Sequence, residues 1–149
     1  MCGIIAIVTR PSTRPVPTPD QLLAALDAAV AATDLPGLTV HAAEVDRLLH
    51  GVPGTQALLG RHELVAGIVA RLDVLDARIA EVEAHAETGD LDADEVERRS
   101  AEVIAARDAV WAIRHVRLRS ARAVAVLAGV VGSDAAVAGF LAVQLSLSA

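Results

Sequence analysis

Hydrophobic residues recur at helical spacing along most of the chain, and the longest regular stretch begins after Arg61. Apolar residues there follow one another at alternating steps of three and four: Val65, Ile68, Leu72, Leu75, Ile79, Val82 and Ala86. This spacing is typical of a coiled-coil seam over about three heptads. A tight turn with a glycine and a capping aspartate is expected at 88–92, followed by a second long helix over about 92–128. The pattern predicts an antiparallel helical hairpin over about 61–128.

The hairpin is expected to be longer than a small globule is wide. At about 1.5 Å per residue each arm would reach roughly 40 to 55 Å. We therefore expect it to protrude from, or to lie across, a larger body.

Shorter helices are predicted on either side of the hairpin. Thr18-Pro19-Asp20-Gln21 has the residues of a capping box, with proline in the first turn, and predicts a helix over 19–33. The segments 35–37 and 51–54 contain Pro and Gly and are expected to interrupt the helical structure. A second helix is predicted between them, over 38–50, and a short turn is predicted at 55–60. Gly129–Gly132 ends the hairpin, and a last apolar helix is expected over 133–149.

The first residues have a different pattern. Ile4-Ile5-Ala6-Ile7-Val8 is a β-branched run, which predicts a strand buried on both faces within 1–9. Prolines at 11, 15 and 17 make 10–18 an extended connector. The expected fold is thus mainly α: one N-terminal buried β-strand, a Pro-rich connector, a helical segment over 19–132 that contains the hairpin, and the helix over 133–149.

Composition narrows the classes of function. The chain has 149 residues, 54% of them hydrophobic, and a net charge of −6, which disfavours a nucleic-acid binder. It contains no Lys or Asn and a single Cys, so it offers no Schiff-base lysine, no asparagine oxyanion donor and no disulfide framework. No secretory signal is visible, and Asp134 interrupts the most apolar stretch. We expect a cytoplasmic protein that does not span a membrane.

The single cysteine, Cys2, has a position with chemical meaning. Removal of Met1 would leave one residue with both a thiol nucleophile and a free α-amino group that can serve as its base. Met1-Cys2-Gly3-Ile4-Ile5-Ala6-Ile7-Val8 resembles the opening of class II, N-terminal-nucleophile glutamine amidotransferases, and within them most closely that of glucosamine-6-phosphate synthase (glutamine–fructose-6-phosphate aminotransferase). The alternative is a chance cysteine before an ordinary core strand.

The resemblance implies a piece of a larger enzyme. In that family the first strand leads soon to a helix ending in an Arg-Gly-Tyr-Asp-Ser-Ala-Gly motif, followed later by an arginine for the glutamine carboxylate and an Asn-Gly oxyanion pair. None of these is present, although 140–149 resembles the start of that helix. The implied arrangement is a helical insertion after the first strand, with the remainder in a missing C-terminal portion or a partner chain. Glutamine and possibly fructose 6-phosphate would be substrates, no cofactor is implied, and the isolated chain is expected to be inactive.

Other candidates are weaker. The histidines, at 41, 50, 62, 85 and 115, lack metal-ligand spacing and are interpreted as exposed helical residues. Seven arginines of the second arm, at 98, 99, 107, 114, 117, 119 and 122, either pair with acidic residues of the first arm or recognise phosphate or an acidic partner. Trp111 is interpreted as a seam anchor rather than a substrate stack. The competing function is a non-enzymatic helical interaction module, with homo-oligomerisation as one form of it.

Overall fold

Residues 12–88 and 92–124 are described by a computed structural model, and within these ranges the chain is helical without any strand. The helices are α1 (Pro19–Ala31), α2 (Leu35–Leu48), α3 (Gly51–Leu58), α4 (His62–Thr88) and α5 (Ala93–Trp111). A π-helical segment, η1 (Ala112–Leu118), follows α5 directly, and helix continues from it to residue 124. The prediction of a mainly α protein is confirmed. The strand predicted within 1–9 and the helix predicted over 133–149 lie outside the described residues.

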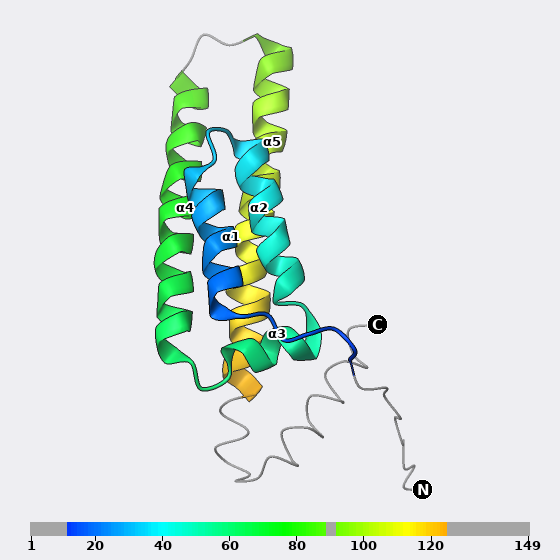
Figure 1. Ribbon diagram of the computed structural model, residues 1–149. Helices are drawn as coiled ribbons and strands as arrows, with labels where there is room; N and C mark the ends of the chain where they lie inside the picture. The colour runs from blue at the N-terminus through cyan, green and yellow to red at the C-terminus, as the bar shows by residue number, and fades with distance from the viewer. Residues whose placement is uncertain (1–11, 89–91, 125–149) are drawn as a thin grey trace, which may run out of the picture.

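The helices form two antiparallel hairpins packed side by side (Figure 1). One consists of α1 and α2 and the other of α4 and α5; α1 lies along α4, and α2 lies along α5 and η1. Neighbouring helices from different hairpins run parallel, and the short α3 connects the two hairpins at one end of the bundle (Figure 1). We call this end the base.

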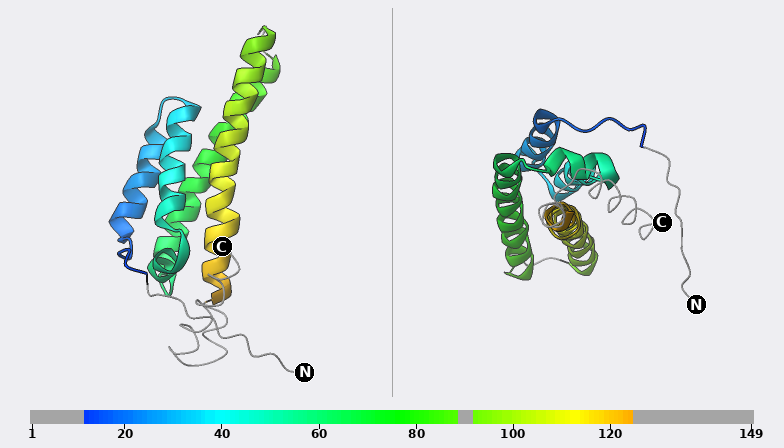
Figure 2. Two further views of the ribbon diagram at one scale, coloured as in Figure 1. Left: turned by 90° about the vertical axis from the view of Figure 1, so that its right-hand side faces the viewer. Right: turned by 90° about the horizontal axis from the view of Figure 1, so that it is seen from below.

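The apolar seam of α4 forms one side of the core, as predicted. Ile68, Leu72, Leu75 and Ile79 are buried, and Val65 and Val82 pack against the core from its edge. Opposite them, α5 and η1 contribute Val103, Ala106, Val110 and Ile113, while the first hairpin contributes side chains that include Leu22, Leu26, Leu38 and Val45. At the end opposite the base, α4 and α5 extend beyond α1 and α2 (Figure 2), so the expected protrusion is confirmed for the closed end of the hairpin.

Helix α1 begins as predicted, because its capping box is complete. The Thr18 hydroxyl accepts a hydrogen bond from the Gln21 amide at 3.2 Å, and the Gln21 side chain accepts one from the Thr18 amide at 2.9 Å. The Asp27 carboxylate of this helix accepts two hydrogen bonds from the Arg71 guanidinium of α4, with Nε–Oδ1 at 2.6 Å and Nη2–Oδ2 at 3.1 Å. This bidentate pair ties the two parallel helices together.

Two expected breaks are in fact helix starts. Helix α2 begins at Leu35 instead of residue 38, because Asp34 caps it by accepting a hydrogen bond from the Gly37 amide at 2.7 Å. The segment 51–54 lies inside α3, where Gly51 has a φ of 70° and Pro53 occupies the first turn. The first-turn amides of a helix have no partner within it, so proline loses no hydrogen bond there. The breaks lie slightly earlier than predicted, at 32–34 and 49–50, and most of the turn predicted at 55–60 belongs to α3.

The π-helical segment shifts the seam of the second long helix. Buried positions follow one another from Val103 to Ile113 in steps of three and four, but the next buried residue is Ala121. Two steps of four join Ile113 to Ala121 through Arg117, which is half-buried. A π turn contains about one residue more than an α turn, and this accommodates the shift.

Both ends of the described chain lie at the base of the bundle (Figure 2). The segment before α1 is held there by Arg14, which donates to the carbonyl oxygens of Arg47, at 2.9 Å, and His50 at the end of α2. The last described helical turns, which follow η1, also end at the base (Figure 1). The helical bundle therefore has its entry and exit at one end.

Candidate functional site

Cys2, the predicted nucleophile, lies outside the described residues together with the rest of the segment that carries the resemblance. Its assignment, including the role of its α-amino group as base, stays a prediction.

The histidines do not assemble into a metal site within 12–88 and 92–124, where no group of three or more potential ligands lies close together. His62, His85 and His115 are exposed helical residues, as interpreted from the sequence. His41 is half-buried, and His50 lies between α2 and α3. The Nδ1 atom of His85 is 2.7 Å from the Glu81 carbonyl oxygen, one turn earlier.

Five of the seven arginines of the second arm form ion pairs. Arg107 pairs with Glu83, and Arg114 donates from Nη2 to Asp73 at 2.7 Å and Asp76 at 2.9 Å, so both reach the first arm as predicted. Arg98 and Arg99 pair with acidic residues of their own helix. These contacts favour a structural role for most of the basic arm.

Arg117 makes a contact that the sequence analysis missed. Its Nε and Nη2 atoms donate to the two carboxylate oxygens of Asp46 in α2, at 2.7 and 3.0 Å. Both side chains are largely buried, with exposed fractions of 19% and 26%. The pair joins the two hairpins along the line where α2 meets η1.

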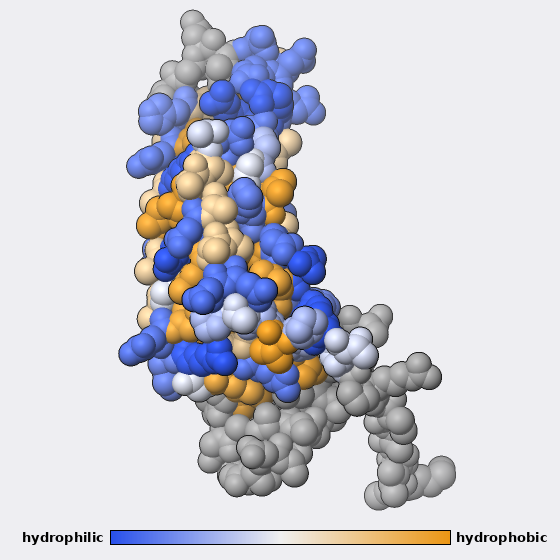
Figure 3. Space-filling view, viewed as in Figure 1, coloured by the Kyte–Doolittle hydropathy of each residue, from blue (hydrophilic) through white to orange (hydrophobic). Residues whose placement is uncertain are grey.

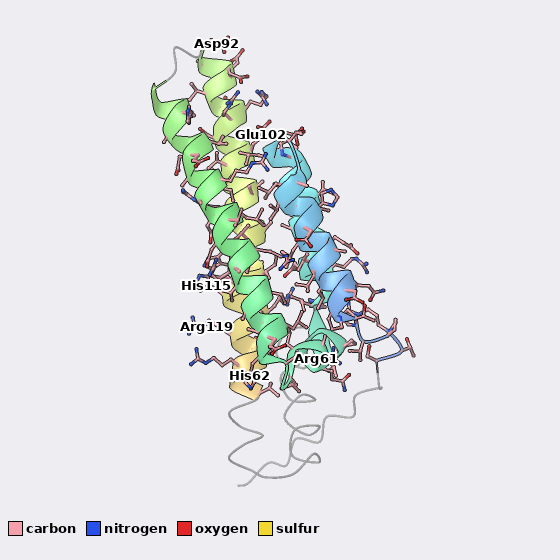
Figure 4. All side chains as sticks on the ribbon, turned by 60° about the vertical axis from the view of Figure 1, so that its left-hand side comes forward. Arg61, His62, Asp92, Glu102, His115 and Arg119 are labelled. Atoms are coloured by element: carbon pink, nitrogen blue, oxygen red, sulfur yellow. The ribbon has the colours of Figure 1, made fainter. Side chains whose placement is uncertain are left out.

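The remaining two arginines of this arm, Arg119 and Arg122, have no hydrogen-bond or ion-pair partner in the described part of the chain. Arg119 lies near the base, as does His62 at the start of α4 (Figure 4). These three side chains line a cavity of about 550 Å³. We call it the basal cavity and treat it as the candidate site.

The basal cavity has an apolar floor and a basic rim. Leu58, Val65, Val69, Leu118 and Ala121 provide the apolar surface, and Gly60 completes it where α3 turns into α4. The rim consists of His62, Arg114, Arg119 and Arg122, and no carboxylate of the described residues lines the cavity. An apolar pocket with a few convergent charged groups is the usual form of a small-molecule site.

Arg114, which also lines this cavity, has one buried donor without a partner among the described residues. Its Nη2 atom makes both carboxylate contacts, and its buried Nε atom has no hydrogen-bond partner. Burial acts to lower the pKa of this guanidinium, but the hydrogen bonds and charges of Asp73 and Asp76 outweigh it, so the pKa is raised. Arg114 is therefore a permanent cation with donor capacity to spare.

Trp111 is not a seam anchor, and that interpretation is corrected. Its side chain is 57% exposed, because Val110 and Ile113 occupy the seam on either side of it. The indole stacks instead on the His115 imidazole one turn later, with ring centroids 5.4 Å apart and an interplanar angle of 28°. The pair covers part of the outer surface of α5 and η1 and does not line the basal cavity.

Within the described ranges, no helix combines the length and the apolar character that crossing a bilayer requires. Comparison with known proteins identifies no match to this chain, whether among family models, curated proteins or solved structures.

Proposed function

We propose that this chain supplies the nucleophile-bearing start of a class II glutamine amidotransferase similar to glucosamine-6-phosphate synthase, and that its helical bundle is an insertion after the first strand. The observation that carries the proposal is the opening Met1-Cys2-Gly3-Ile4, which places the only cysteine directly after the initiator methionine. Fructose 6-phosphate is the proposed acceptor of the ammonia.

The proposed chemistry belongs to Cys2 once Met1 has been removed. Its α-amino group takes the thiol proton, and the sulfur attacks the side-chain carboxamide carbon of glutamine. The tetrahedral intermediate breaks its C–N bond, the protonated amine returns the proton to the departing ammonia, and a thioester remains. Water then hydrolyses the thioester to glutamate and restores the thiol.

The arrangement of the bundle supports an insertion. A domain inserted into another fold must leave and re-enter its host at nearby points, and this is easiest when its two ends lie together. The two ends of the described chain both lie at the base (Figure 2). Arg14 ties the entering segment to the end of α2, which fixes the point of entry relative to the helices.

The isolated chain is proposed to be inactive. The sequence has no Asn to act as an oxyanion donor, and loss of one such donor typically costs 10² to 10³ in rate. The described residues form helices without a sheet around which the active site of such an enzyme could be built. The remaining parts are proposed to come from a further segment or from a partner chain, and no cofactor is invoked.

The test begins with the mature N-terminus. Intact-mass measurement of the native protein should show loss of Met1, and a glutamine-analogue electrophile should label Cys2 in the assembled enzyme. Cys2→Ser should abolish the label without changing helicity. Retention of Met1, or equal labelling of the Cys2→Ser variant, would refute the proposal, and so would a downstream and neighbouring coding region without an Arg-Gly-x-Asp-Ser-Ala-Gly-like motif.

A second candidate function, a helical interaction module, is favoured by a different feature. Near the closed end of the second hairpin, Val96 and Ile104 are exposed and, with Val103, line a groove of about 350 Å³. On the face shown in Figure 3, however, this end is covered mainly by hydrophilic side chains. Concentration-independent sedimentation of the full chain as a monomer would argue against self-association through this groove.

A further inference from the structure

We propose that the basal cavity binds a small organophosphate, with the phosphate held by Arg119, Arg122 and His62 and an apolar or ring-shaped body resting on the cavity floor. This inference does not depend on the amidotransferase proposal. It concerns a different part of the chain and a different chemistry from Cys2.

The distribution of charge carries the first step. The chain as a whole is acidic, with a net charge of −6, yet among the described residues four basic side chains and no acidic one line this cavity. Asp73 and Asp76 both pair with Arg114. Arg119 and Arg122 are exposed and unpaired within the described part of the chain, unlike the five other arginines of their arm. A cavity that concentrates unpaired cations favours an anionic ligand.

The geometry of the cations favours a tetrahedral, doubly charged anion. Arg119 and Arg122 are three residues apart and so share one side of their helix, and His62 faces the same cavity from α4. Guanidinium forks bind phosphate oxygens through paired, charge-assisted hydrogen bonds. The two guanidinium cations match the charge of a phosphate monoester and the His62 imidazole can add a hydrogen bond, whereas a single carboxylate would leave donors unused.

The start of α4 adds to the same field. This helix has 27 residues and begins at His62. The backbone hydrogen bond at this end runs from the Val65 amide to the Arg61 carbonyl oxygen, at 3.0 Å. The amides of the three residues before Val65 therefore have no partner within the helix. Unpaired amides and the helix dipole both favour an anion here.

The floor determines what else the ligand carries. Its five apolar side chains come from α3, α4, η1 and the turn after η1. Inorganic phosphate would leave this surface in contact with water, while a ligand with an apolar or ring-shaped body would cover it. A volume of about 550 Å³ suits a compact organic molecule.

The test uses the full chain and phenyl phosphate as probe, with inorganic phosphate and phenol as the two halves of that molecule. Isothermal titration should show saturable binding of phenyl phosphate and weaker binding of each half. The variant R119Q/R122Q should weaken the binding at least about tenfold, because it removes both guanidinium partners of the phosphate. R47Q/R98Q removes the same charge from exposed sites outside the cavity and should bind like the wild type.

Each other outcome overturns the proposal. Absence of saturable binding would show that the cavity is not a phosphate site. Equal weakening of phenyl phosphate binding in both double variants would show that only the overall charge of the protein attracts the ligand. Tighter binding of an acidic peptide than of phenyl phosphate, lost in R119Q/R122Q, would assign the cavity to a protein partner instead. Circular dichroism must show the same helicity and melting temperature for both double variants, since neither pair of side chains is buried.

Discussion

Replacing Gly54 with alanine is expected to destabilise the bundle, whereas the same change at Gly67 should stabilise it. Gly54 is buried in α3. A methyl group added there would fall on the backbone of Leu49, against its Cα atom, carbonyl carbon and carbonyl oxygen. A backbone cannot rotate aside as a side chain does, so α3 would have to move away from the end of α2.

The size of the effect follows from two opposing contributions. Overpacking of this kind costs about 1–3 kcal/mol, and a clash with backbone belongs at the upper end of that range. Alanine in place of glycine within a helix returns about 1 kcal/mol, so Gly54→Ala should lose about 2 kcal/mol. At Gly67 the nearest atoms, Arg71 Nη1 and Leu23 Cδ2, lie 3.6 Å from the added methyl, which is ordinary contact. Only the gain of about 1 kcal/mol applies there.

Urea unfolding followed by far-ultraviolet circular dichroism measures both changes. The midpoint should fall for Gly54→Ala and rise for Gly67→Ala, with an unchanged slope, and the two free energies of unfolding should differ by about 3 kcal/mol. Equal midpoints would refute the close packing of α3 against Leu49. Because Leu58 of α3 lines the basal cavity, Gly54→Ala should also weaken binding of phenyl phosphate, while Gly67→Ala should not.

Three further predictions concern charge and surface. Asp46→Ala leaves Arg117 partly buried without its partner and should lower the free energy of unfolding by roughly 1–3 kcal/mol in urea titrations; no loss would show that the pair does not join the hairpins. The hydrogen bond from Arg71 holds the pKa of Asp27 below its usual 3.8. The stability that this ion pair contributes is therefore present above pH 3.8 and is lost as the pH falls through the lower pKa of the folded state. Asp27→Asn should flatten the acid side of a plot of melting temperature against pH. Trp111→Ala should change stability by less than about 1 kcal/mol because the ring is exposed, and a larger loss would restore a role in the core.

The parts of the fold that were predictable from the sequence depend on local repetition. The α4 seam and the capping box of α1 are each encoded within a few turns, so periodicity and spacing were sufficient. The starts of α2 and α3 were missed because proline and glycine break a helix in its middle but are compatible with its first turn, and the two positions look alike without the structure. Trp111 was assigned to the core because it is large and aromatic. It directly follows the buried Val110, and this shift of one residue turns its side chain to the outside of the helix.

Interactions between distant segments could not be predicted in the same way. Asp46 and Arg117 are 71 residues apart in the chain, and they meet only because α2 lies along η1. The π-helical segment leaves a trace in the sequence as two successive steps of four, from Ile113 through Arg117 to Ala121, but an arginine at the middle position hides it. The basal cavity combines residues from α3, α4, η1 and the helical turn after η1, and the sequence analysis recognised only the arginines among them.

The two ends of the bundle differ in how their arginine side chains are paired. Around the middle and closed end of the second hairpin, the charges of Arg98, Arg99, Arg107 and Arg114 are paired with carboxylates. At the base, where both ends of the described chain lie (Figure 2), Arg119 and Arg122 line the basal cavity and have no such partner within 12–88 and 92–124. If the bundle is an insertion, its base is the end that faces the host domain. A ligand bound in the basal cavity would then lie at the junction of the bundle and its host.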